Sequence, residues 1–188
     1  MSQQELLKSV VEALDRAGCP YFITGSTASS LQGEPRATHD IDVVVALAEA
    51  DVPALESAFT PPRYYFDAVA AAEAIRAYQE FNVIDAAEGL KVDFWVMKDE
   101  PYGRSAMARR QRIEAFGIAF WVSSPEDTIL SKLWWAVLSG GSEKQFRDAL
   151  RVYEIQAGGM AAAYLDEWAG RLGVTELLAR LREEAKPL

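Results

Sequence analysis

The chain has 188 residues, half of them apolar and a quarter charged, which predicts a globular protein with one good core and room for a small helical annex. Its net charge of −9 argues against a surface that wraps nucleic acid, although a local basic site for a nucleotide or a tRNA end stays compatible with it. A single cysteine, no signal-peptide pattern and no membrane-length apolar run together predict a cytoplasmic protein without membrane contact.

The N-terminal part of the chain predicts a helix, a strand and a second, short helix. Apolar residues at helical spacing indicate the first helix over residues 3–17, and a β-rich run over 21–24 indicates a buried strand. The short helix is expected over residues 27–31, so its exposed N–H groups would lie beside Gly25 and Ser26. Such a helix start favours phosphate binding. The alternative is that Gly25 and Ser26 form only a tight strand-to-helix turn.

Two carboxylates mark the next predicted strand, over about residues 40–46. Side chains alternate along a strand, so Asp40 and Asp42 point to one side while Ile41, Val43 and Val45 point into the core. Neighbouring carboxylates repel each other unless a cation lies between them, and oxygen ligands suit Mg²⁺ or Mn²⁺. The alternative is a pair of solvated acids at the end of a strand.

The middle of the chain predicts a third carboxylate on a later strand. Helices are expected over residues 48–59 and 67–79, followed by a hairpin with strands over 81–85 and 90–97. Asp93 interrupts the apolar sequence of the second hairpin strand. Because a carboxylate in a buried strand is costly unless it is paired or bound to metal, Asp93 is the expected third ligand.

Residues 99–112 are polar and contain the basic cluster. Its arginines could guide an RNA end or another anionic acceptor, or belong to an ordinary solvated loop, which is the favoured interpretation. The cluster consists of Arg104, Arg109, Arg110 and Arg112.

The C-terminal part of the chain predicts helices only. After a last strand over residues 116–122, Ser124 and Asp127 form a capping box at the start of a new helix. Two or three more helices follow, separated by glycines. This change in composition predicts a core over residues 1–122 and a C-terminal helical subdomain over 123–188.

Other polar residues near these motifs have two interpretations each. Arg36 could reach a phosphate or pair with Glu34, and Thr38 is expected mainly to support the loop before the carboxylate strand. Lys132 could contact a triphosphate or be a surface lysine of an amphipathic helix. His39, the single histidine, is interpreted as structural.

The order of these motifs resembles that of the nucleotidyltransferase superfamily, which includes DNA polymerase β-like enzymes. The shared pattern is Gly25-Ser26, then two acids around Ile41, then Asp93 on a later strand. The stretch 24–42 is especially similar to the small bacterial branch, which includes abortive-infection-type toxins and the lincosamide and aminoglycoside adenylyltransferases. Residues 124–133 are similar to a later motif of the toxin-like group. The resemblance covers roughly residues 20–135, and the toxin-like proteins are often longer.

The resemblance implies an α/β (α+β) nucleotidyltransferase fold: a small mixed sheet with helices on one side, plus the C-terminal helical subdomain. It implies Mg²⁺- or Mn²⁺-dependent transfer of a nucleoside monophosphate from an NTP to an acceptor hydroxyl on an RNA end such as tRNA, a protein or a small molecule. The alternative is a catalytically silent nucleotide-binding or toxin–antitoxin protein, and either is compatible with assembly of several copies. The implied catalytic and metal-binding residues are Asp40, Asp42 and Asp93, and the implied nucleotide-binding residues are Gly25, Ser26, Arg36, Thr38 and Lys132.

Overall fold

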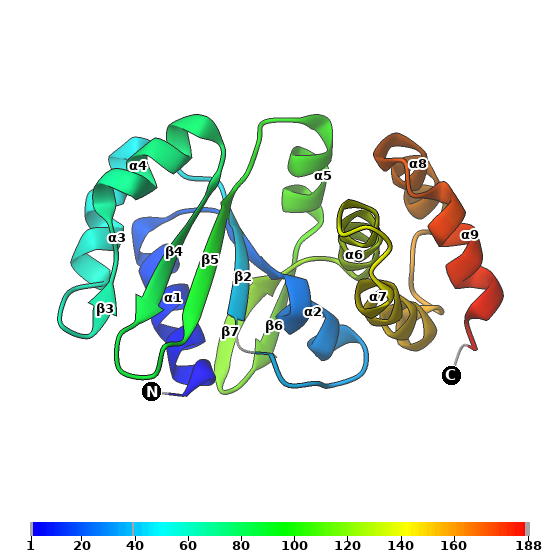
Figure 1. Ribbon diagram of the computed structural model, residues 1–188, viewed down its shortest axis with the longest axis horizontal. Coiled ribbons are helices and arrows are strands. Elements are labelled where there is room, and N and C mark those ends of the chain that lie inside the picture. Colours follow the sequence, from blue (N-terminus) through cyan, green and yellow to red (C-terminus); the bar gives the residue numbers. More distant parts are fainter. Residues whose placement is uncertain (1, 39, 187–188) are drawn as a thin grey trace. The chain divides into compact units, whose positions relative to one another are not determined.

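A computed structural model describes residues 2–38 and 40–186 (Figure 1). His39, for which a structural role was expected, lies outside the described residues. The helices are α1 (Gln3–Ala17), α2 (Gly25–Gln32), α3 (Val52–Ala58) with the 3-10 turn η1 (Glu49–Asp51) before it, α4 (Ala68–Ala77), α5 (Pro101–Arg109), α6 (Pro125–Leu138), α7 (Glu143–Gln156), α8 (Ala162–Leu172) and α9 (Thr175–Glu184). The strands are β1 (Tyr21–Thr24), β2 (Asp40–Val45), β3 (Tyr64–Tyr65), β4 (Glu80–Asp85), β5 (Lys91–Val96), β6 (Gln111–Ala115) and β7 (Ile118–Val122).

Two compact units make up the described chain. Unit 1 contains the described residues up to Ile23 and those from Thr38 to Val122, and unit 2 contains Thr24–Ala37 and the described residues from Ser123 onward. The predicted core therefore differs from unit 1 in one segment, because residues 24–37 group with the C-terminal helices.

Unit 1 is built on a mixed sheet with the strand order β3-β4-β5-β2-β1-β7-β6. The central pairs β2/β5 and β1/β7 are parallel, whereas β3/β4, β4/β5 and β6/β7 are antiparallel. The register of β2 with β5 places Asp40 beside Lys91 and Asp42 beside Asp93. Paired residues of adjacent strands point to the same side of a sheet, so these four side chains share one face. We call it the carboxylate face.

The opposite, apolar face of the sheet carries much of the unit 1 core. Val43 and Phe94 are a register pair on this face, and both side chains are fully buried. Phe59, which follows α3, lies 6.4 Å from Phe94 between ring centroids. On the other side, Ala106 and Met107 of α5 pack with Phe22, Val44 and Met97. Helices therefore cover both sides of the sheet, and the expectation of helices on one side was wrong.

Three further elements of unit 1 differ from the sequence-based expectation. Residues 101–109 form α5 rather than part of a polar loop, because Ala106 and Met107 face the core and Pro101 stands in the first turn. Strand β6 was not expected, since four of its five residues are polar or small. Strand β3 has only two residues, too few for an alternating pattern.

Unit 2 joins α2 to the four C-terminal helices. The helix α2 begins at Gly25, two residues earlier than expected, so Gly25 and Ser26 belong to its first turn. At the other end of α2, a Cβ atom on Gly33 would come within 3.0 Å of the Val152 backbone nitrogen in α7. The small size of Gly33 therefore allows α2 and α7 to approach closely.

The start of α6 is fixed by buried polar groups, and Ser124 is its N-cap as predicted. The Ser124 hydroxyl accepts a hydrogen bond from the Asp127 N–H at 3.1 Å and donates one to the Asp127 carboxylate at 2.7 Å. The Tyr164 hydroxyl of α8 donates to the same carboxylate at 2.8 Å. These bonds anchor the helix that carries Lys132.

No helix within residues 2–38 and 40–186 is long and apolar enough to cross a membrane.

Candidate active site

The carboxylate face of unit 1 brings the three predicted acids onto two neighbouring strands. Asp42 and Asp93 are directly opposite each other in the parallel pair β2/β5, and Asp40 lies two residues before Asp42 on the same side. Adjacent strands are about 4.8 Å apart, so the two opposed carboxylates are near neighbours. Asp40 is exposed, whereas Asp42 and Asp93 are partly buried. The three acids therefore lie on one face of two neighbouring strands, and their role as metal ligands stays a prediction.

Two side chains of β5 already contact these acids. The Trp95 indole nitrogen donates a hydrogen bond to Asp42 Oδ1 at 3.2 Å, and Lys91 Nζ lies 2.9 Å from Asp93 Oδ2. The hydrogen bond to Asp93 raises the pKa of Lys91, and the nearby Asp93 and Asp40 charges act in the same direction against desolvation. Lys91 is therefore a firmly protonated cation beside the predicted metal ligands.

The donor chemistry of this face fits Mg²⁺ or Mn²⁺, because all three predicted ligands supply carboxylate oxygens. In the described part of the chain, however, no three Asp, Glu, His or Cys side chains are arranged closely enough to form a metal-binding group. The Asp93 carboxylate is paired with the Lys91 ammonium group instead. The three acids have ligand atoms suited to Mg²⁺ or Mn²⁺ and lie on the same face of the sheet. One of them, Asp93, is paired with Lys91.

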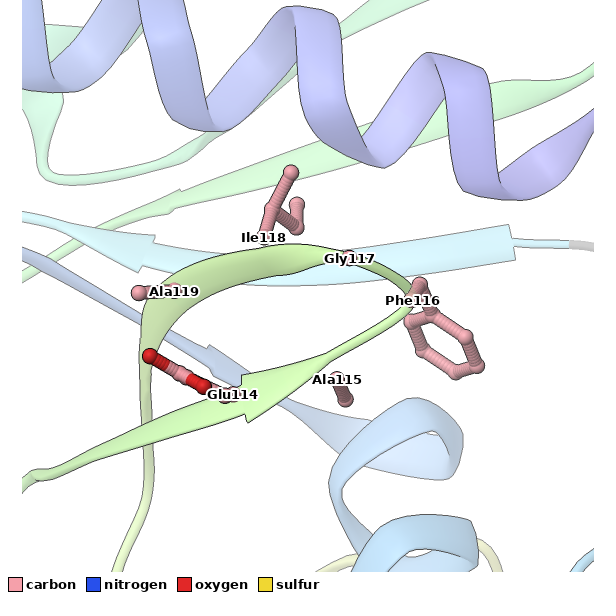
Figure 2. Close-up of a pocket in the computed structure, with 6 residues that line it drawn as sticks. All are labelled: Glu114, Ala115, Phe116, Gly117, Ile118 and Ala119. Atoms are coloured by element: carbon pink, nitrogen blue, oxygen red, sulfur yellow. The ribbon is translucent and has the colours of Figure 1, made fainter.

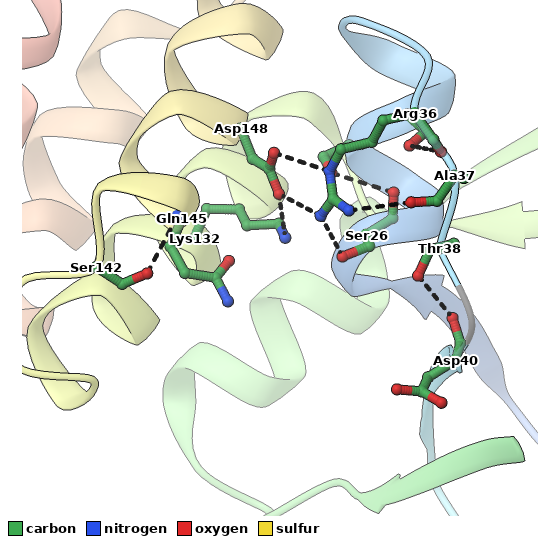
Figure 3. A network of polar contacts seen from close by, with 11 residues as sticks. Ser26, Arg36, Ala37, Thr38, Asp40, Lys132, Ser142, Gln145 and Asp148 are labelled. Atoms are coloured by element: carbon green, nitrogen blue, oxygen red, sulfur yellow. Dashed lines mark hydrogen bonds and ion pairs between the residues drawn. The ribbon is translucent and has the colours of Figure 1, made fainter.

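Unit 2 holds three of the other predicted residues, Ser26, Arg36 and Lys132, in a polar network with Asp148 of α7 (Figure 3). The Arg36 guanidinium donates to both Asp148 oxygens, at 3.1 and 2.8 Å, and Lys132 Nζ lies 2.8 Å from Asp148 Oδ2. Arg36 also donates to the Ser26 hydroxyl at 2.6 Å. Arg36 and Lys132 thus meet at one acid, and Ser26 joins the network through Arg36.

The network excludes one interpretation of Arg36 and one of Lys132, and their contacts with a phosphate stay predictions. Lys132 is only 4% exposed, so the surface-lysine alternative was wrong. Arg36 pairs with Asp148 rather than with Glu34, which instead lies 3.1 Å from Arg151. A bidentate guanidinium and a buried ammonium on one carboxylate form a preorganised pair of cations, a common arrangement for binding phosphate.

Asp148 is the residue that the sequence analysis missed. Its position on the amphipathic α7, four residues before the buried Val152, places it at the border of the apolar stripe, which is a weak signal. Burial alone would raise the pKa of Asp148, but the hydrogen bonds from Arg36 and Lys132 outweigh this effect and hold the pKa below its usual range. Asp148 is therefore ionised at neutral pH and holds the two cations in place.

The lowered pKa of Asp148 predicts a pH-dependent contribution to stability. Because the native state favours the ionised form, the contribution is fully present above the ordinary aspartate pKa of about 3.9 and is lost as the pH falls below it. Urea unfolding of the wild type and Asp148→Asn at pH 3 to 7 measures this. We expect the difference in unfolding free energy to be constant above about pH 5 and to shrink at pH 3. A difference that grew towards pH 3 would contradict the assignment.

Gly25 and Thr38 have local roles that the coordinates define. Gly25 has a φ of +62° at the first position of α2, a backbone conformation that glycine adopts without strain. The Thr38 hydroxyl donates to the Asp40 carbonyl at 3.2 Å (Figure 3), which is the loop-supporting role expected for it. Their contacts to a nucleotide stay predictions.

The basic cluster is largely engaged in contacts within unit 1. Arg110 and Arg112 lie over the Trp121 ring, at 4.5 and 5.6 Å from its centroid, and Arg104 lies 2.6 Å from Asp99. These arginines belong to α5 and β6 or flank them, so the solvated-loop interpretation was wrong in structure.

A surface hollow lies at the turn between β6 and β7, lined by residues 114–119 (Figure 2). Phe116 and Gly117 at its tip both have positive φ, at 54° and 74°, as in a tight hairpin turn. None of the predicted site residues lines this hollow, and it plays no part in the site.

Several solved structures have a similar fold. The solution structure of the antibiotic-resistance factor ANT(2'')-Ia has a TM-score of 0.55 and 16% identity over 96% of this chain and 95% of that chain. Its crystal structure in complex with adenylyl-2''-tobramycin has a TM-score of 0.55 and 15% identity over 92% of this chain and 98% of that one. An antigenic nucleotidyltransferase-like protein from Paracoccidioides brasiliensis has a TM-score of 0.55 and 15% identity, with 97% and 93% of the two chains covered.

No family model matches the chain, and no curated protein matches it. At 15–16% identity, the similarity lies in the fold. The chain has a nucleotidyltransferase fold.

Proposed function

We propose that this chain is a Mg²⁺-dependent nucleotidyltransferase that moves a nucleoside monophosphate from an NTP to an acceptor hydroxyl. The observation that carries the proposal is the placement of Asp40, Asp42 and Asp93 on one face of the parallel strands β2 and β5. Within a nucleotidyltransferase fold, three carboxylates on one face are the group that phosphoryl transfer uses to bind divalent ions.

The three acids are proposed to act where the acceptor hydroxyl attacks the α-phosphate of the NTP. Asp40 and Asp42 would hold one Mg²⁺ ion and would share a second with Asp93, and two-metal chemistry would supply neutralisation of charge on the attacking and leaving oxygens. Asp93 is also the proposed general base, which accepts the proton of the acceptor hydroxyl. The acceptor oxygen forms a bond to the α-phosphorus while the bond from that phosphorus to the pyrophosphate oxygen breaks, and pyrophosphate leaves.

Three residues of unit 2 are proposed to bind the triphosphate: Ser26, Arg36 and Lys132. Ser26 stands in the first turn of α2, where backbone N–H groups have no partner within the helix. Arg36 and Lys132 supply two positive charges that Asp148 holds in place. Gly25 and Thr38 complete the proposed nucleotide-binding set through the loop conformations on which Ser26 and Asp40 depend. Because the two cations are preorganised, little side-chain entropy is lost when phosphate binds.

Acceptor labelling tests the proposal. Wild-type protein is incubated with each α-³²P-labelled NTP, Mg²⁺ and either a tRNA fraction or a panel of hydroxyl-bearing antibiotics. We expect one acceptor class to carry label, and EDTA to abolish the labelling. The resemblance to the adenylyltransferase ANT(2'')-Ia favours a small molecule, and the net charge of −9 points the same way. Labelling that persists in EDTA would contradict the metal dependence, and no label on either acceptor class would count against transfer.

One observation favours the second candidate, a catalytically silent nucleotide-binding or toxin–antitoxin protein in the cytoplasm. The pairing of Asp93 with Lys91 leaves the third acid engaged by a protein cation. Under that candidate the chain binds an NTP but transfers nothing, so nucleotide binding without any labelled acceptor would favour it.

A further inference from the structure

Lys91 has a position that no role proposed so far explains. As the first residue of β5, it stands directly opposite Asp40 in the parallel register and two residues before Asp93 on the same face. Its Nζ lies 2.9 Å from Asp93 Oδ2. The site therefore contains one protein cation among the three acids that are expected to bind a divalent ion.

This ion pair differs from the surface pairs of the molecule in its burial. The Asp93 side chain is 14% exposed and that of Lys91 is 37% exposed, whereas both partners of the Arg76–Glu49 pair are about half exposed. Water screens the Lys91–Asp93 pair less than it screens the Arg76–Glu49 pair, so each partner has a larger effect on any other ion that approaches. A divalent cation that approaches Asp93 is therefore repelled by the Lys91 ammonium group and must displace it to bind.

We propose, on the basis of the proposed function, that Lys91 is a built-in competitor for the metal site, which occupies Asp93 until a divalent ion displaces it. Asp40 and Asp42 then bind the first ion, and Asp93 becomes a ligand only after its carboxylate has left Lys91. The absence of a ready three-ligand group among the described residues agrees with this order. Lys91 is thus a positioning residue, and it lowers metal affinity in the absence of nucleotide.

Titration of the nucleotide-free protein with Mn²⁺, followed by electron paramagnetic resonance of the free ion, tests this. We expect Lys91→Met to bind Mn²⁺ about fivefold more tightly than the wild type at low salt, with a smaller gain at high salt. Lys91→Arg keeps the competing cation and should stay within about twofold of the wild type. Lys98→Met removes the same charge from an exposed loop position after β5 and should also leave the affinity unchanged.

A second background separates competition at Asp93 from a general change in charge. In Asp93→Asn protein, Lys91 has no carboxylate to occupy, so the added Lys91→Met change should raise Mn²⁺ affinity by at most about twofold. If the wild type binds Mn²⁺ and Lys91→Met binds it with equal or lower affinity, the proposed role of Lys91 is overturned and the proposed metal site stays intact. If neither the wild type nor Lys91→Met binds Mn²⁺, both the role of Lys91 and the proposed metal site are overturned. Circular dichroism of each variant confirms that it is folded.

Discussion

Replacing Asp42 by Asn is expected to reduce nucleotidyl transfer by at least about 100-fold while leaving the unfolding free energy nearly unchanged. Asp42 stands beside Asp93 on the carboxylate face, so a neutral amide there removes one charge from the expected metal-binding group. Its Oδ1 atom accepts the hydrogen bond from Trp95, and the amide oxygen of Asn can still accept it. Packing is therefore preserved, and the loss of transfer reports the missing charge.

The measurement compares the rates of acceptor labelling by the wild type and Asp42→Asn at saturating Mg²⁺. Asp99→Asn serves as the matched control because it makes the same chemical change at an exposed acid of unit 1, 75% exposed and paired with Arg104. We expect the control to keep wild-type activity. Equal labelling by Asp42→Asn and the wild type would remove Asp42 from the catalytic set.

Replacing Asp148 by Ala is expected to lower the unfolding free energy by about 3–5 kcal/mol. The substitution removes the carboxylate that lies 2.8 Å from the ammonium group of Lys132, a side chain that is 4% exposed. It also removes the two hydrogen bonds from the Arg36 guanidinium to Asp148. A buried charge that loses its partner is costly because little water replaces the lost interaction. Urea unfolding followed by circular dichroism measures the change.

Two further variants show whether the cost comes from the loss of the Lys132–Asp148 charge pair. Asp166→Ala breaks an ion pair with Arg182 in the same unit, but its side chain is 57% exposed, so we expect a loss below about 1 kcal/mol. Lys132→Met combined with Asp148→Leu removes both charges of the buried pair and should recover at least half of the loss in Asp148→Ala. A double variant no more stable than Asp148→Ala would show that packing, rather than the charge, accounts for the effect.

The elements that the sequence predicted well are those whose signals are local. The alternation of polar and apolar residues across Asp40–Val45 fixes both the strand and the side to which its acids point. The capping residues Ser124 and Asp127 fix the start of α6, and Gly18 ends α1 with a left-handed backbone conformation. In each case neighbouring residues in the chain determine the conformation.

The parts that the sequence could not reveal depend on distant partners. Strand β6 pairs along β7, and its own residues show no apolar alternation. Asp148 lies 112 residues after Arg36, so nothing in the local pattern connects the two. Lys91 is close to Asp93 in sequence, yet its importance depends on the register with β2, which places it beside Asp40. Tertiary pairing determined all of these contacts.

Calorimetric titration with each of the four NTPs, in Mg²⁺ and in EDTA, tests the central claim most directly. The proposal predicts that the wild type binds at least one NTP in Mg²⁺, that EDTA weakens this binding strongly, and that Asp42→Asn loses the Mg²⁺-dependent part. Lys132→Met should weaken binding under both conditions, because its charge is assigned to the triphosphate rather than to the metal. Absence of binding to any NTP, or binding by the wild type and Asp42→Asn that is equally strong in Mg²⁺, would contradict the proposed site.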